Sequence, residues 1–290
     1  MPSVKELRQR IKSVGNIKQI TRAMEMVATT KLRRFQDRAT ASRPYTQEIT
    51  GLVARLAAVI GEDIRGAPLF QPREGNRTLV LLISSDRGLC GAYNSNVARA
   101  LEIWRAEHAD REIEYSVYGR KGNTYLTKRG YKVVSYLSDP PLEAVDYKTA
   151  RTTARALVQA FLAGEYDDVW LLYSAFESLA KYVPTWVRFL PIEASSLGQA
   201  EAAPMGDVLL EPDARTVFEE LVPRYLETRI YNALIESLTS EYASRRFAMK
   251  NATDAATDMQ KVLRGMYNRK RQEKITKELL DIVGGAEAVS

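Results

Sequence analysis

The segment RIKSVGNIKQITRAMEMVATTKLRR (Arg10–Arg34) decides how the first part of the chain folds. Its apolar residues recur every three or four positions, which is the period of an amphipathic α-helix. The rest of its surface is basic, with seven Lys or Arg and a single acid, Glu25. Such a helix needs an apolar neighbour on one side and favours an acidic partner on the other.

The helical pattern extends in both directions and predicts a helix over residues 1–60, from Val4 to Ile60. Ser3 and Glu6 have the spacing of a capping box, and Pro44 predicts a kink or break. The apolar stripe indicates a phase slip near Gly15. Its members are Val4, Leu7, Ile11 and Val14 before the slip, and Ile17, Ile20, Met24, Val27, Leu32 and Phe35 after it.

A second helical pattern covers residues 212–286, with interruptions only at Pro223 and Gly265. Arg224–Val283 alone would form a helix of roughly 90 Å, longer than a compact domain needs. The pattern therefore predicts a long antiparallel two-helix coiled coil formed by the N- and C-terminal segments, with an exposed tip at Gly265–Ser290. The expected seam consists of Met249, Ala252, Ala256, Met259, Leu263 and Met266.

Between these ends, residues 77–194 alternate strand and helix patterns, which predicts an α/β globular domain with a largely parallel sheet. The expected strands are Thr78–Ser84, Glu112–Tyr118, Lys132–Leu137, Asp168–Phe176 and Tyr182–Leu190. The expected helices are Asn96–Ala109, Gly122–Arg129 and Tyr147–Ala163. Glycine and proline mark loops at Gly61–Asn76 and Ser195–Gly206.

Composition limits the classes of protein to which the chain can belong. The chain has 290 residues, 45% hydrophobic content and a net charge of +6, with two basic ends and a mildly acidic centre. No apolar run approaches the ~20 residues that span a bilayer. Cys90 is the single cysteine, so no intramolecular disulfide forms. The first residues lack the apolar core of a signal peptide, and we expect them to belong to the mature protein.

The residues make a weak case for an enzyme. Neither GxxxxGK[ST] nor GxGxxG occurs. Cys90 and His108 allow a nucleophile pair in principle, but the simpler interpretation is a turn residue and a helix-surface residue. SSDRGLCGAYNSN (Ser84–Asn96) has the form of an anion-binding turn, or of a turn that only needs glycine. The basic face of Arg8–Arg38 could bind phosphates, face solvent or contact an acidic protein surface. Composition alone does not distinguish these three possibilities.

Three blocks resemble the gamma subunit of F-type ATP synthase. Arg10–Arg33 is similar to the family pattern of the N-terminal helix. SSDRGLCGAYNSN is similar to its central glycine block, and Ser240–Val289 (SEYASRRFAMKNATDAATDM…YNRKRQEKITKELLDIVGGAEAV) to its C-terminal helix. The blocks occur in family order, and the resemblance covers the whole chain, most loosely at Gly61–Arg77 and Ser195–Glu211.

The resemblance implies a function without an active site of its own. The helical ends would form the rotor shaft of the central stalk, inside a ring of three alpha and three beta subunits. The globular domain would contact the epsilon subunit and the membrane c-subunit ring. Proton flow would turn the shaft and drive the beta subunits through their states. No cofactor, metal or nucleic acid is implied, and the location is peripheral, at the cytoplasmic face of a bacterial plasma membrane.

By the same resemblance, two groups of residues contact the ring. Lys18, Arg22 and Met24 lie near a beta lever, with Arg245 level with Met24. Arg271 and Gln272 match a hydrogen-bonding catch, and Thr276 and Glu278 share that region. The globular-domain motif consists of Asp86, Arg87, Gly88, Cys90 and Gly91. Packing of the Arg271 stem on Ile275 is an alternative to the catch.

The chain departs modestly from the family pattern. Gly15, Asn16 and Ile17 replace commoner polar residues, and glycine loosens a helix by ~1 kcal/mol. Ala92 stands where many relatives have glycine, and the redox-regulatory insert of chloroplast relatives is absent. The alternative function is a basic coiled-coil nucleic-acid-binding protein with an α/β domain. A Cys90-dependent α/β enzyme is a third hypothesis.

Overall fold

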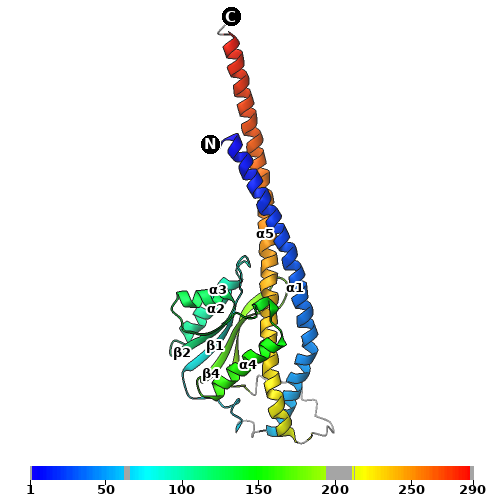
Figure 1. The fold of residues 1–290 in the computed structure, drawn as a ribbon, viewed down its shortest axis with the longest axis vertical. Helices are drawn as coiled ribbons and strands as arrows, with labels where there is room; N and C mark the ends of the chain where they lie inside the picture. The colour runs from blue at the N-terminus through cyan, green and yellow to red at the C-terminus, as the bar shows by residue number, and fades with distance from the viewer. Residues whose placement is uncertain (1, 62–65, 194–210, 212, 288–290) are drawn as a thin grey trace. The chain divides into compact units, whose positions relative to one another are not determined.

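The structure is a computed structural model and describes residues 2–61, 66–193, 211 and 213–287. Two compact units divide the chain. The helical-pair unit contains Met1–Thr29 and Arg245–Ser290, and the α/β unit contains Thr30–Ser244. Helices α1 (Val4–Ile60) and α5 (Ala214–Glu287), labelled in Figure 1, each contribute to both units. The loop expected at Ser195–Gly206 lies outside the described residues.

The α/β unit contains a five-stranded sheet with the order β3-β2-β1-β4-β5. Strands β1 to β4 are parallel, and β5 is antiparallel to β4. The predicted largely parallel sheet is confirmed, with every predicted boundary within three residues of the observed one. The strands are β1 (Arg77–Ile83), β2 (Glu112–Tyr118), β3 (Val133–Leu137), β4 (Asp168–Phe176) and β5 (Tyr182–Leu190). The helices between them are α2 (Tyr93–Glu107), α3 (Arg120–Lys128), the 3₁₀-helix η2 (Leu142–Ala144) and α4 (Tyr147–Leu162).

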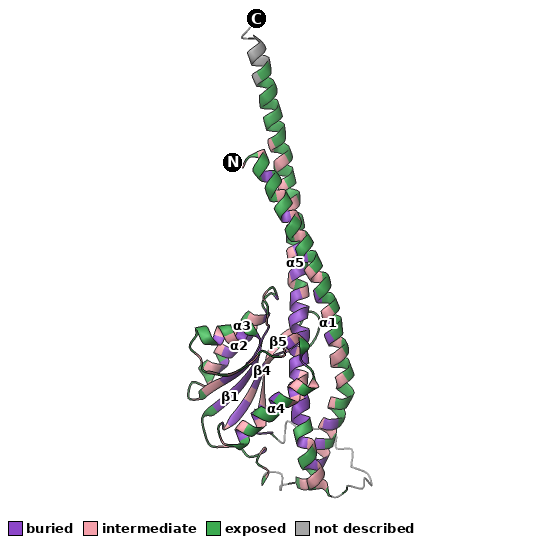
Figure 2. Cartoon of the chain, viewed as in Figure 1, coloured by how far each residue is buried: buried purple, intermediate pink, exposed green. Residues whose placement is uncertain are grey.

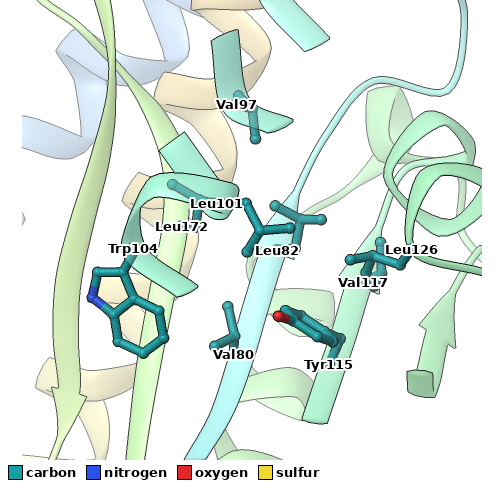
Figure 3. Packing of buried hydrophobic residues seen from close by; sticks show 9 residues of the cluster. All are labelled: Val80, Leu82, Val97, Leu101, Trp104, Tyr115, Val117, Leu126 and Leu172. Atoms are coloured by element: carbon teal, nitrogen blue, oxygen red, sulfur yellow. The ribbon is translucent and has the colours of Figure 1, made fainter. Parts of the chain in front are cut away.

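Strand β1 lies at the centre of the sheet, and every residue after Arg77 in it is buried. A strand covered on both faces needs a continuous apolar run, which LVLLI at 79–83 provides. Val80 and Leu82 belong to a core cluster with Val97, Leu101 and Trp104 of α2. Figure 3 shows these side chains between the helix and the sheet, with Tyr115, Val117, Leu126 and Leu172 completing the cluster.

The part of α5 in the α/β unit is buried on almost every side from Tyr225 to Ser244 (Figure 2). Small polar residues make this possible because each finds a hydrogen-bond partner. Ser237 bonds the Tyr93 hydroxyl at 2.6 Å, and Ser240 donates to the Ser174 carbonyl at 3.0 Å. Short side chains therefore let the helix lie close against the sheet while their hydroxyls stay bonded.

Neither proline interrupts its helix, so a break at Pro44, one of the two predicted alternatives, and the interruption at Pro223 are wrong. Proline leaves the carbonyl four residues earlier without its N–H donor. Here Pro44 and Thr40 are both exposed, and so are Pro223 and Glu219. Water can satisfy a carbonyl on an exposed face, which is why both helices continue. Gly265 likewise lies within α5.

The helical-pair unit is an antiparallel pair. Thr253 Oγ1 of α5 donates to Thr21 Oγ1 of α1 at 2.9 Å. One to two helix turns from this pair, Gly15 of α1 faces the side-chain amide of Gln260 of α5. As the residue number falls on α1 it rises on α5, which defines the antiparallel direction. The predicted two-helix pairing is therefore present within this unit.

The phase slip predicted near Gly15 is wrong. Leu7, Val14, Thr21 and Ala28 are buried at an unbroken seven-residue spacing. Ile17, Ile20 and Val27, which the slip would bury, are 52%, 60% and 56% exposed. A slip requires a local change in helix phase, and α1 is continuous through Gly15.

The seam predicted on α5 is correct at four positions and wrong at Met259 and Met266. Met249 and Ala256 are buried and Ala252 and Leu263 are half-buried, but Met259 and Met266 are 56% and 52% exposed. The intervening seam positions belong to Thr253, Gln260 and Tyr267, one residue further along, because Thr21 and Gly15 face that side of the helix. Residues Thr253, Gln260 and Tyr267 are buried or half-buried.

The exposed tip of α5 begins later than predicted. Continuing the Thr21–Thr253 register places Val4, the first residue of α1, level with Lys270. Tyr267 and Lys270 are accordingly half-buried, whereas residues 271–280 are all exposed. The free tip therefore starts at Arg271, not at Gly265, and its 271–287 helix measures about 25 Å.

We expect Gly15→Ala to stabilise the chain by about 0.5–1 kcal/mol, because alanine removes the entropic penalty of glycine within a helix. An added Cβ would lie 3.1 Å from Gln260 Nε2, the end of a flexible side chain that can move. Urea unfolding followed by helical circular dichroism measures the change. A loss of stability would show that the pair requires the closer approach that only glycine allows.

Candidate functional site

Two of the three α1 residues expected to contact partners, Lys18 and Arg22, line a surface groove of the helical-pair unit. The groove has a volume of about 600 Å³ and is lined by Ile11, Lys12, Gly15, Asn16, Lys18, Gln19, Arg22, Ala23, Met26 and Gln260. The Arg22 side chain is 65% exposed and lies 3.6 Å from Glu25, while Lys18 and Met24 are half-buried. Glu25 is only 18% exposed, so the pair is half-buried and only its Arg22 end faces outward.

Arg245 differs from the other basic residues because it is only 7% exposed. Counting eight residues from the Thr21–Thr253 pair along each helix places Arg245 opposite Thr29. Met24 therefore lies between the levels of Thr253 and Arg245. Most of the Arg245 surface is covered by its own chain, which leaves little of it for a partner.

The residues expected to form the catch all lie on the free tip. Arg271, Gln272, Thr276 and Glu278 are exposed. Glu278 pairs with Lys274 at 3.4 Å, an exposed contact within one helix turn. Ile275, four residues after Arg271, is 47% exposed. The structure brings these residues together on one solvated helix segment.

The helical-pair unit also exposes large apolar residues that the sequence patterns assigned to its seam or left unassigned. They are Ile17, Ile20, Met26 and Val27 on α1, and Phe247, Met259, Val262, Met266, Ile275, Leu279, Leu280 and Ile282 on α5. Large exposed apolar surface marks sites of protein interaction. Seam residues of α1 follow one another every seven positions, at Leu7, Val14 and Thr21. This spacing is the sequence signal that distinguishes the seam from the exposed apolar residues.

The glycine block Ser84–Asn96 joins β1 to α2 and is held by its own side chains. The Asp86 carboxylate accepts hydrogen bonds from the backbone N–H groups of Arg120 at 3.1 Å and Leu142 at 3.2 Å. Gly91 has a φ of 56°, which favours glycine. Gly88 lies beside Lys121, and the Arg87 carbonyl accepts from Ser85 Oγ at 2.8 Å. Asp86 thus ties the turn after β1 to the starts of α3 and η2.

Cys90 occupies a structural position in this block. It is 2% exposed, its carbonyl accepts from Ser244 Oγ at 2.6 Å, and its thiol lies 3.1 Å from the Asn94 amide. His108 follows the C-terminal end of α2 and stacks on Trp104 at 4.1 Å. Cys90 precedes the opposite end of this 15-residue helix, roughly 22 Å away. The two side chains therefore cannot form a nucleophile pair.

One network joins α1, η2 and α5 within the α/β unit. The Glu143 carboxylate accepts from Lys31 Nζ and from the Tyr242 hydroxyl, and Lys31 lies 3.3 Å from that hydroxyl. Burial alone would raise the pKa of Glu143, but the hydrogen bonds from Lys31 and Tyr242 outweigh it and hold the pKa below its usual value. The charged carboxylate is thus the form that links the three elements.

Two other kinds of feature are missing from the residues that the structure describes. Among them, no three His, Cys, Asp or Glu side chains gather as a group that could hold a metal ion. No helix within the same described ranges is long and apolar enough to cross a membrane.

Comparison with known proteins identifies the family. Residues 3–289 match the family model described as ATP synthase. The ATP synthase gamma chain of Geotalea uraniireducens is 37% identical over 100% of this chain and 99% of its own length. That of Mycolicibacterium smegmatis is 40% identical over 99% of this chain and 98% of its own.

Solved structures share the fold. A chain of the Euglena gracilis mitochondrial ATP synthase superposes with a TM-score of 0.67 at 21% identity, covering 99% of this chain and 94% of that one. A chain of the Tetrahymena thermophila mitochondrial ATP synthase central stalk gives 0.59 at 24% identity, covering 80% and 99%. The relatives support a role in the central stalk of F-type ATP synthase and not the nucleic-acid-binding alternative. The chain belongs to the ATP synthase gamma chain family.

Proposed function

We propose that this chain is the rotor shaft in the central stalk of an F-type ATP synthase and has no active site of its own. Its partners would be three alpha and three beta subunits around the helical pair. The epsilon subunit and the membrane c-ring would contact the α/β unit. The complex would lie at the cytoplasmic face of a bacterial plasma membrane, where the chain is a peripheral subunit.

The observation that carries this proposal is the surface of the helical-pair unit. Its two helices bury a narrow seam and leave other large apolar side chains exposed, such as Ile20 and Met259 at 60% and 56%. The unit has sixteen Lys or Arg and eight Asp or Glu. Apolar residues separated by cations suit contact with a partner that supplies both apolar and acidic surface.

Mechanical coupling requires that this surface differ from one side to the other. A rotor shifts a partner between conformations only if it contacts those conformations with different free energies. The groove beside Lys18 and Arg22 makes one side of the pair hollow and basic. Contacts between charges hold weakly at exposed side chains such as Arg22, which is 65% exposed, so they can be broken and remade during rotation.

Co-expression of this chain with the alpha and beta subunits of its own organism tests the assignment. We expect native mass spectrometry to detect a complex of three alpha, three beta and one copy of this chain. Its ATPase activity should depend on this chain being present. A chain that stays apart, or that elutes with nucleic acid and loses it steeply with salt, would contradict the shaft.

The double variant Arg271→Ala and Gln272→Ala is expected to lower ATP synthesis several-fold while the complex still assembles. Both side chains lie on the free tip, so their removal should not unfold the chain. The measurement is the ratio of ATP made to protons moved in reconstituted vesicles. Lys277→Ala, an exposed cation on the same segment, is the matched control. Equal synthesis rates in wild type and double variant would argue against a catch at these residues.

A further inference from the structure

We propose that the α/β unit binds a small amphipathic carboxylate in a cavity between α2 and α3 at the carboxyl end of β1. The cavity has a volume of about 500 Å³. Small-ligand sites typically measure about 300–1,000 Å³ and combine apolar walls with a few placed polar groups. Leu82 and Ser84 mark one end of the cavity, at the carboxyl end of β1, and it continues between α2 and α3 as far as Glu102 and Arg129.

The inner wall of the cavity is apolar. Leu82 of β1, Val97 and Leu101 of α2 and Tyr125 of α3 line it. Ser84, a polar residue in the wall, is already bonded to the protein. Its Oγ donates to the Tyr118 carbonyl at 3.0 Å and accepts from the backbone N–H of Gly122 at 2.8 Å. A ligand that enters the cavity would therefore gain free energy mainly by burying apolar surface.

The mouth of the cavity is basic. The Arg99 and Lys121 side chains line it, are exposed, and form no ion pair with any residue that the structure describes. The Glu102 carboxylate does not offset them, because it lies 3.4 Å from Arg129 and accepts from the Tyr125 hydroxyl at 2.8 Å. Burial and Glu102 raise the pKa of Tyr125 to about 12, so its hydroxyl remains a donor. Two cations are thus free to bind an acidic head group.

The backbone argues against a phosphate ligand. Phosphate-binding turns present free backbone N–H groups at a helix N-terminus. At the start of α3 these groups are occupied: Arg120 donates to Asp86 at 3.1 Å, Lys121 to the Ser85 carbonyl at 2.9 Å, and Gly122 to Ser84. Only side-chain cations remain for an anion. An apolar body that ends in one carboxylate fits this arrangement, and a nucleotide does not.

Octanoate added to the full-length chain tests the site. Binding is followed by saturation-transfer NMR and by fluorescence of Trp104, which lies one turn beyond Leu101 on α2. We expect saturable binding, with butyrate at least tenfold weaker because it buries four fewer methylene groups. Octanol, which lacks the charge, should also be at least tenfold weaker. Equal affinities for octanoate and octanol would overturn the assigned ligand class.

Two variants locate the binding. Ala98→Phe should block the cavity and abolish saturable binding, since Ala98 lines it. Arg99→Gln with Lys121→Gln should weaken octanoate binding about tenfold without changing octanol binding. Lys128→Gln with Lys148→Gln removes two exposed cations outside the cavity and should leave the affinity within twofold. Octanoate binding that survives both cavity variants would place the ligand elsewhere and overturn the proposal. Neither result depends on assembly with alpha and beta subunits.

Discussion

Gly119→Ala is expected to lower the free energy of unfolding of the α/β unit by about 4 kcal/mol. Gly119 follows β2 with a φ of 92°, a conformation that costs other residues about 1–2 kcal/mol. A Cβ there would lie 2.1 Å from the carbonyl oxygen of Ser84, and overpacking of this kind costs a further ~1–3 kcal/mol. The clash is with backbone, so no side-chain rotation relieves it.

Urea unfolding followed by tryptophan fluorescence measures this effect. All three tryptophans of the chain, Trp104, Trp170 and Trp186, lie in the α/β unit and contact one another. Gly130→Ala is the matched control because Gly130 also has a positive φ, 73°, but no atom lies within 4 Å of its added Cβ. We expect that variant to lose only about 1 kcal/mol. Similar losses of stability in the two variants would mean that the clash with the Ser84 carbonyl oxygen contributes nothing to the destabilisation.

Glu143→Gln is expected to lower the free energy of unfolding by about 1–2 kcal/mol at pH 7. The substitution keeps the shape of the side chain but removes the charge that bonds Lys31 and Tyr242. The side chains of Lys31 and Glu143 are 34% and 30% exposed, and solvent screening keeps the loss below that of a fully buried pair. If the chain is the proposed shaft, a weaker link between η2 and the two long helices should also lower ATP synthesis.

The stability difference between wild type and Glu143→Gln depends on pH in a definite direction. The pKa of Glu143 is lower in the folded chain than in the unfolded one, so folding favours its charged form. Its contribution is complete above the unfolded pKa of ~4.3 and is lost as the pH falls through the lower, folded value. The stability difference between wild type and Glu143→Gln should therefore be constant near neutrality and shrink in acid. A difference that grows in acid would contradict the assigned shift.

Glu177→Gln supplies the comparison for Glu143→Gln. Glu177 pairs with Lys181, but their side chains are 48% and 66% exposed. Exposed pairs contribute at most about 1 kcal/mol and often nothing. We expect the free energy of unfolding to change by less than about 0.5 kcal/mol in this variant. An equal loss in both variants would show that charge alone matters, and not the link between three elements.

Local sequence determined the class of the fold. The runs in β1 and β4 are apolar enough for strands buried on both faces, and the long 3.6-residue patterns at the two ends require helices that cover each other. Period and propensity act within a few residues, so the sequence alone predicts which segments form helices or strands. The resemblance of the two ends and of Ser84–Asn96 to one family indicated the same architecture.

The tertiary structure decided which side of each helix is covered. The apolar stripe through Ile20 looked as regular as the one through Val14, yet only the latter meets α5. The hydrogen bond between Thr21 and Thr253 sets that register across 232 positions of sequence, and no local pattern reports such a contact. The free cations Arg99 and Lys121 beside the cavity depend in the same way on where β1, α2 and α3 meet. Periodicity describes one element, whereas burial depends on the partner that packs against it.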